Sequence, residues 1–212
     1  MSGSDESWRP AVGPPEEIDA GPIVLRRYRP SDLDELAAVI EASRDHLAKW
    51  LPWAATADGA SLADFIERSG RAWDDRTTFN YAMREPGGEV VGGIGLHPRV
   101  GPRALEIGYW VRADRINRGY ASAAAGALTA AALALPDVDR VEIHCDEANV
   151  RSAAVPRKIG FRLDRIEPDE ITAPAAAGRS MIWVQYARAK ETRTRAGRPQ
   201  MAQAPETGKS GS

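Results

Sequence analysis

A glycine turn joins a strand-like run to a long helix of small residues in the middle of the chain. Residues 105–111 read as a strand, residues 112–118 as a turn, and Gly119 opens the helix. Backbone amides at a helix start have no partner within the helix, and the helix dipole adds partial positive charge there. Gly119 lets a ligand approach the backbone closely. This arrangement suits a pyrophosphate, although a glycine that only eases the turn before a core helix would look the same.

Basic residues gather at this turn. Arg112, Arg115 and Arg118 surround the expected helix start, where they would favour an anionic ligand. The whole chain of 212 residues carries a formal net charge of −2, so it has no global positive field that would recruit nucleic acid. We therefore expect a small anionic ligand here rather than a nucleic acid.

Alternating strands and helices would position these residues. Apolar periodicity, prolines and glycines predict strands at residues 23–27, 79–84, 90–97, 105–111, 140–145, 161–165 and 180–187. Helices are expected at residues 31–40, with Ser31 as N-cap, and at 43–50, 61–73, 119–135 and 152–159. The order predicts an α/β sheet with helices on both faces.

Composition limits the class of protein. Hydrophobic residues make up 43% of the chain, enough for a sizeable core, and no apolar run reaches the length of a membrane helix. The single cysteine, Cys145, and the lack of zinc-ligand spacing favour a cytoplasmic protein without a metal site. Residues 1–20 and 190–212 have little to bury and are expected to be disordered tails around one domain at 21–189.

Three motifs together resemble the GNAT superfamily of N-acetyltransferases, over about residues 22–188. The first is the turn Ile116-Asn117-Arg118-Gly119-Tyr120-Ala121, in which Ile116 replaces the family's leading Gln or Arg. The second is Asn149-x-x-Ser152 followed by Gly160-Phe161. The third combines His46-Leu47-x-x-Trp50-Leu51-Pro52-Trp53 with the strand Glu106-Ile107-Gly108-Tyr109-Trp110, and is similar to the RimJ/RimL-type enzymes.

The resemblance implies a mixed, mostly antiparallel, V-split sheet of about seven strands flanked by helices, with acetyl-CoA in the split. The side chains and backbone that would hold acetyl-CoA are Tyr109, Trp110, Val111, Ile116, Asn117, Arg118, Gly119, Tyr120, Ala121, Asn149, Ser152, Arg157 and Lys158. Asn149 could instead only form a turn, and Arg157 and Lys158 could be a solvated helix face.

Two residues are candidates for proton transfer. Glu106 is the candidate base, because a carboxylate that faces an apolar cleft has a raised pKa. It could also be a solvent-facing residue, since Leu105, Ile107 and Tyr109 form the opposite face of the strand. Ser152 would donate a proton to the leaving thiolate by resemblance, or would only cap a helix. The region that holds a tyrosine in many family members, around residues 155–159, has none here.

The resemblance therefore implies an enzyme that moves an acetyl group from acetyl-CoA to a primary amine. A protein or peptide N-terminal α-amine is the first expectation, and a homodimer is a further one. The alternatives are a small-molecule amine (an aminoglycoside, polyamine or amino acid) and a catalytically silent CoA-binding regulatory module.

Overall fold

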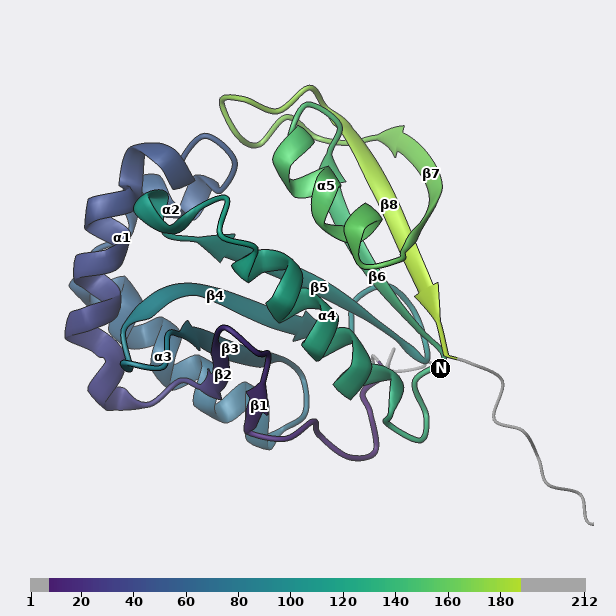
Figure 1. Ribbon diagram of the computed structural model, residues 1–212, viewed down its shortest axis with the longest axis horizontal. Coiled ribbons are helices and arrows are strands. Elements are labelled where there is room, and N and C mark those ends of the chain that lie inside the picture. The colour runs from purple at the N-terminus through teal and green to yellow at the C-terminus, as the bar shows by residue number, and fades with distance from the viewer. Residues whose placement is uncertain (1–7, 188–212) are drawn as a thin grey trace, which may run out of the picture.

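The computed structural model describes residues 8–187, which form one mixed sheet with helices on both faces (Figure 1). The order of strands across the sheet is β1-β2-β3-β4-β5-β6-β8-β7, and every neighbouring pair is antiparallel except β5 and β6. The strands are β1 (Glu17–Asp19), β2 (Val24–Arg27), β3 (Phe79–Arg84), β4 (Val90–His97), β5 (Ala104–Val111), β6 (Arg140–Asp146), β7 (Arg162–Pro168) and β8 (Arg179–Tyr186).

The sheet divides between β5 and β6. The two strands pair over only four residues, from Ala104 opposite Arg140 to Ile107 opposite Ile143. Beyond Ile107, β5 stays paired with β4 as far as Val111, whereas β6 stays paired with β8 as far as Asp146. Figure 1 shows β6, β8 and α5 turning away from β4 and β5. The expected V-split is confirmed, and it exposes the facing edges of two strands.

The helices pack on opposite faces of the sheet (Figure 1). Leu36, Ile40 and Ile66 belong to an apolar cluster on one face, whereas Leu128 and Ala153 belong to the main core on the other. The helices are α1 (Leu33–Leu47), α2 (Pro52–Thr56), α3 (Gly59–Asp74), α4 (Tyr120–Leu133) and α5 (Val150–Lys158), with short 3-10 turns η1 (Pro30–Asp32) and η2 (Ala113–Arg115).

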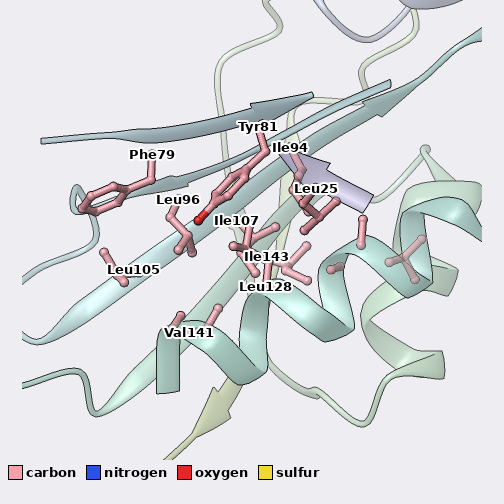
Figure 2. Close-up of a cluster of buried hydrophobic side chains, with 14 of the residues drawn as sticks. Leu25, Phe79, Tyr81, Ile94, Leu96, Leu105, Ile107, Leu128, Val141 and Ile143 are labelled. Atoms are coloured by element: carbon pink, nitrogen blue, oxygen red, sulfur yellow. The ribbon is translucent and has the colours of Figure 1, made fainter. Parts of the chain in front are cut away.

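The main core lies between the sheet and α4. Figure 2 shows Leu96, Ile107 and Ile143 pointing from three neighbouring strands toward Leu128 of α4. Strand residues two apart face the same side, so Leu105, Ile107 and Tyr109 share this face and Glu106 faces the other. This part of the sequence prediction is confirmed, because Leu105 and Ile107 are buried in the main core and Tyr109 packs against it.

Three local expectations are wrong. Residues 33–47 form a single helix that begins after Asp32, so Ser31 is not its cap and residues 43–50 are not a separate helix. Pro52 starts α2 at its first turn, where a missing N–H costs nothing. Asn149, not Ser152, caps α5 with its side chain.

The described part of the expected N-terminal tail belongs to the domain. Residues 17–19 add strand β1 to the sheet edge, which makes eight strands rather than seven. Trp8 packs against the main core, and the Tyr81 hydroxyl donates to the carbonyl of Pro15 at 2.8 Å. A strand of three residues with one apolar side chain gives no periodicity to detect. The expected tail at 190–212 and residues 1–7 lie outside the described residues.

Candidate active site

A groove of about 1030 Å³ runs through the opening between β5 and β6. One end lies at the turn before α4, where Asn117 and Gly119 contribute to its wall. The other end is lined by the segment between α1 and α2, including Lys49 and Trp50, and by the β7–β8 loop, including Glu170. The groove therefore connects the two faces of the sheet through the split.

The turn before α4 has the backbone that an anion site needs. Asn117 and Gly119 both have left-handed backbone angles, with φ of 61° and 83°. The first hydrogen bond of the helix runs from the amide of Ala123 to the carbonyl of Gly119 at 2.9 Å, so the amides of residues 120–122 precede the helical ladder. A Cβ atom added at Gly119 would have no described heavy atom within 4 Å. The open space and the free amides fit a pyrophosphate.

The arginines of this turn are held by a carboxylate of the β3–β4 hairpin, Glu89, and by one within the turn, Asp114. Arg112 pairs with Glu89 and with Asp114, and Arg115 pairs with the same two residues. Arg115 lines the groove, whereas Arg112 and Arg118 lie outside it. The positive charge predicted at this turn is therefore largely neutralised, and backbone amides remain its main attraction for phosphate.

A proline inside α5 fixes a tyrosine from β5 beside Ser152. Pro156 has no N–H, so it cannot make the helical bond to the carbonyl of Ser152 four residues earlier. The Tyr109 hydroxyl donates to that carbonyl at 3.1 Å, and its oxygen also lies 3.1 Å from Ser152 Oγ. A phenol has one hydrogen, so Ser152 donates to Tyr109 in this arrangement. Burial raises the pKa of Tyr109, and this effect outweighs the hydrogen bond from Ser152, which lowers it. Tyr109 therefore stays protonated.

Tyr109 of β5 places a phenol hydroxyl beside α5, which has no tyrosine of its own around residues 155–159. The sequence assigned Tyr109 to acetyl-CoA through its backbone, and no residue pattern indicated that its hydroxyl meets Ser152, 43 positions away. Asn149 lines the groove, but its Oδ1 accepts the amide of Ser152 at 3.1 Å, which leaves its side-chain nitrogen as the donor for a ligand. Cys145 also lines the groove, and burial raises the pKa of its thiol.

Glu106 differs from its predicted state. It lines the groove and is only 8% exposed, so it is not a solvent-facing residue. Arg99 donates two hydrogen bonds to its carboxylate, from Nε at 2.8 Å and from a terminal nitrogen at 2.7 Å. Burial alone would raise the pKa of Glu106, but the hydrogen bonds and charge of Arg99, with smaller contributions from His144 and His97, lower it. The raised pKa predicted from the sequence is wrong, because the guanidinium of Arg99 stabilises the charged carboxylate.

His144 is a groove residue that sequence reasoning missed. Its Nε2 lies 2.7 Å from Oε2 of Glu142, whose other oxygen accepts a 2.7 Å hydrogen bond from Nε of Arg140. Glu142 is 4% exposed, while His144 faces the groove. The pattern Glu-x-His on one strand places both side chains on one face and could have indicated this pair. On β4, which β5 separates from β6, burial lowers the pKa of His97 to about 4, so His97 is neutral at neutral pH.

The groove gathers most of the predicted ligand-binding residues. Those that line it are Tyr109, Trp110, Val111, Ile116, Asn117, Gly119, Tyr120, Ala121, Asn149, Ser152 and Lys158. Two lie outside it. Arg118 is about half exposed and lies 3.8 Å from Glu85, and the guanidinium of Arg157 lies 5.7 Å from the ring centre of Trp183.

Residues 8–187 contain neither a candidate metal site nor a candidate membrane-spanning helix. No group of three or more His, Cys, Asp or Glu side chains there is placed to hold a metal ion. No helix in that range is long and apolar enough to cross a membrane.

Comparison with known sequences gives a family and a relative. The model of the acetyltransferase (GNAT) domain matches residues 23–162. YdaF of Bacillus subtilis (strain 168), a ribosomal N-acetyltransferase by name, is 31% identical over 143 residues, which are 66% of this chain and 77% of YdaF. The range matched by the family model, residues 23–162, contains both the turn before α4 and the Asn149–Ser152 segment.

Comparison with solved structures gives the same fold. The microcin C7 self-immunity acetyltransferase MccE, solved with acetyl-CoA and AMP, superimposes with a TM-score of 0.74 at 19% identity, over 81% of this chain and 97% of MccE. RimL, an acetyltransferase of the α-amine of ribosomal protein L7/L12 solved with coenzyme A, also gives 0.74 at 19% identity, over 81% of this chain and 98% of RimL.

Proposed function

Since this chain belongs to the GNAT acetyltransferase family, with relatives of the RimJ/RimL type, we propose that its acceptor is the α-amine at the N-terminus of a protein or peptide. The acetyl group comes from acetyl-CoA, and the product is the acetylated amine and free CoA thiol. One observation carries the proposal. A single groove leads from the anion site at the start of α4, through the split in the sheet, to an acceptor end formed by the end of α1, the segment between α1 and α2, and the β7–β8 loop.

The donor half of the groove supplies binding and an acid. Backbone amides of residues 120–122 would hold the pyrophosphate, with Lys158 at the same wall for a further phosphate. Ser152 donates its hydroxyl hydrogen to Tyr109 in this structure, and that hydrogen would turn to the sulfur as the C–S bond breaks. Tyr109 keeps its own proton because of its raised pKa, so its task is to position Ser152.

The acceptor half supplies charge of both signs. Arg99 neutralises the charge of Glu106. We therefore propose that Glu106 holds Arg99 in position at the acceptor end, in place of the base role predicted from the sequence. Lys49 and Arg99 could meet acidic side chains of a peptide, and Asp169 and Glu170 could meet basic ones. An open end with mixed charge accommodates a peptide segment rather than a polycation alone, which favours the protein acceptor over an aminoglycoside or polyamine.

Measurement of CoA thiol release from acetyl-CoA tests the function. The acceptor panel contains peptides with free N-termini, the same peptides with blocked N-termini, an aminoglycoside, a polyamine and an amino acid. We expect release with free peptides and none with blocked ones. Release with the aminoglycoside, polyamine or amino acid alone would assign a small-molecule acceptor instead. Acetyl-CoA binding without release for any acceptor would support a silent CoA-binding module.

We further propose a homodimer and a cytoplasmic location. Strand β7 is exposed along its whole length at one edge of the sheet, and it includes the half-exposed apolar residues Leu163 and Ile166. In its sequence Arg162-Leu163-Asp164-Arg165-Ile166-Glu167, residues at equal distances from the two ends have opposite charges or are both apolar. The strand has an irregularity at Asp164, so antiparallel pairing with a second copy would bring the arginines near acidic residues and Leu163 near Ile166 without a fully regular register. The cytoplasm is the compartment where acetyl-CoA would meet newly made protein N-termini.

A further inference from the structure

The proposed reaction needs a group that takes a proton from the acceptor amine. An α-amine is largely protonated at neutral pH, and only the neutral amine can attack a thioester. The two predicted candidates for proton transfer do not fill this role. Glu106 is paired on both oxygens by Arg99, and Ser152 lies on the donor side of the sheet beside Tyr109.

His144 lies where the two strands begin to part. Ile143 opposite Ile107 is the last paired position of β5 and β6, so His144 is the first residue of β6 beyond the pairing. The corresponding residue on β5 is Gly108, which has no side chain. Because Glu106 pairs with Glu142, His144 and Gly108 lie two residues further on the same face of the sheet. The imidazole therefore faces the groove at the start of the split, opposite a residue that takes up no side-chain space.

The contacts of His144 determine which ring nitrogen carries the proton. A carboxylate only accepts hydrogen bonds, so Nε2 at 2.7 Å from Glu142 must be the protonated nitrogen. The neutral ring then has its lone pair on Nδ1. Glu142 is buried and is fixed on its other oxygen by Arg140, so it holds the ring in this state and stabilises the charge that forms on protonation.

From this geometry we propose that His144 is the catalytic base for the acceptor amine and that Glu142 is its positioning residue. The proposal rests on the proposed function. The acceptor ammonium gives one proton to Nδ1, and the neutral amine nitrogen bonds to the acetyl carbon as the C–S bond breaks. The second proton lost by that nitrogen passes through Ser152 to the CoA sulfur. His144 then returns its proton to water, so one proton is released for each ammonium acetylated.

The sheet separates the two proton transfers. His144 lies on the face of the acceptor end, and Ser152 with Tyr109 lies on the face of α4 and α5, with the split between them. The charged groups around His144 are Glu142 and Arg140 on its own strand, Glu106 and Arg99 from β5 and the turn before it, and His97 from β4. Arg165 of β7 acts on Glu142, and Asp169 and Glu170 of the β7–β8 loop line the same groove.

Kinetics of His144→Gln test the role directly. The amide of glutamine can still donate to Glu142 but cannot take the amine proton. We expect kcat/KM for the acceptor to fall by about 100-fold or more, within the usual contribution of a general base, with acetyl-CoA affinity within twofold of wild type. The fall of kcat/KM at acidic pH should disappear in His144→Gln. In Glu142→Gln it should move to lower pH, because the carboxylate no longer stabilises the imidazolium.

Nitrogen NMR of the imidazole rings gives a readout that does not depend on turnover. The chain has three histidines, so His46→Gln and His97→Gln assign the remaining signals. We expect the neutral His144 ring to carry its proton on Nε2, and to lose this preference in Glu142→Gln. A ring protonated on Nδ1 would overturn the proposal even if His144→Gln failed to fold.

The outcomes separate the two proposals. A wild-type protein that releases no thiol with any acceptor contradicts the proposed function, while the NMR result still tests the ring. An active wild type with an equally active His144→Gln, whose pH profile is unchanged, contradicts the role of His144. If Glu106→Gln rather than His144→Gln removes the acidic fall, the base is Glu106 and the proposal is wrong.

Discussion

Arg99 and Glu106 form one unit at the acceptor end of the groove. The side chain of Glu106 is buried, and that of Arg99 is 62% exposed. Removal of Arg99 would leave a buried carboxylate without its two charge-assisted hydrogen bonds. The cost is limited by the exposure of Arg99 to water, so it is smaller than that of breaking a fully buried pair.

We expect Arg99→Met to lower the free energy of unfolding at pH 7 by about 1–2 kcal/mol. The sign of the pH dependence follows from the lowered pKa of folded Glu106. The stabilisation is present above the pKa of an unfolded glutamate, about 4.3, and is lost as the pH falls through the lower folded pKa. Urea unfolding at pH 7 and at pH 3.5 should therefore show a smaller difference between Arg99→Met and wild type at the acidic pH.

Arg103→Met is the matched control for this effect. Arg103 makes the same two-point contact with Asp139, but both side chains are about half exposed. Its effect should be smaller than that of Arg99→Met and nearly the same at both pH values, because water screens the pair. An Arg99→Met effect no larger than that of Arg103→Met, or one that grows at acidic pH, would contradict the interpretation of Glu106 as a buried anion held by Arg99.

A glycine lies at the start of α4 and another in its middle, and replacing them with alanine should have opposite effects on stability. Gly119 has a left-handed backbone angle at the helix start, where an alanine is strained by about 1–2 kcal/mol. Gly126 lies inside the helix, where an added Cβ would make ordinary contact with Ile159 at 3.8 Å. Alanine there favours the helix by about 1 kcal/mol.

We expect Gly119→Ala to weaken acetyl-CoA binding by about 5- to 30-fold, because relaxing the strained turn redirects the amides that hold the phosphates. Gly126→Ala should raise the free energy of unfolding by up to about 1 kcal/mol and leave binding unchanged. Calorimetric titration with acetyl-CoA and urea unfolding measure the two effects. Equal binding by both variants would show that the turn at Gly119 does not contact the phosphates.

Most elements could be predicted from periodicity, and most contacts between them could not. Residues 79–84 and 90–97 were expected as strands with the bounds that the structure has, because apolar residues and glycine turns mark both ends. The groove residues of the turn before α4 were also found. The pairs Arg99–Glu106 and Tyr109–Ser152 depend on how segments pack, and one helix was read as two because Ser43 is polar in sequence but buried in the fold.

The two edges of the whole sheet differ in what protects them. At the first edge, β1 has only three residues. At the other edge, β7 has seven exposed residues and two half-exposed apolar side chains, Leu163 and Ile166. A long exposed edge strand is open to pairing with another chain, and closed symmetry with a second copy is a common way to protect it.

We expect the wild type to be a dimer by light scattering after gel filtration, and the double variant Leu163→Lys and Ile166→Lys to be a monomer. In the dimer the two lysines would face each other across the proposed pairing, where like charges repel. Val12→Lys is the control, since Val12 is also half exposed but lies far from β7 in the sequence and outside the strands. A wild-type monomer at micromolar concentration would contradict this proposal.

Only four residue pairs join β5 to β6, so the two parts of the sheet are held together by few backbone hydrogen bonds. Acetyl-CoA bound in the split would contact both parts of the sheet and so help to hold them together. A ligand that binds only the folded state stabilises it by about 2.7 kcal/mol at one hundred times its dissociation constant. The lifetime of this protein in a cell would then rise and fall with the supply of its own substrate, so that starvation for acetyl-CoA would remove the enzyme by proteolysis as well as slow it.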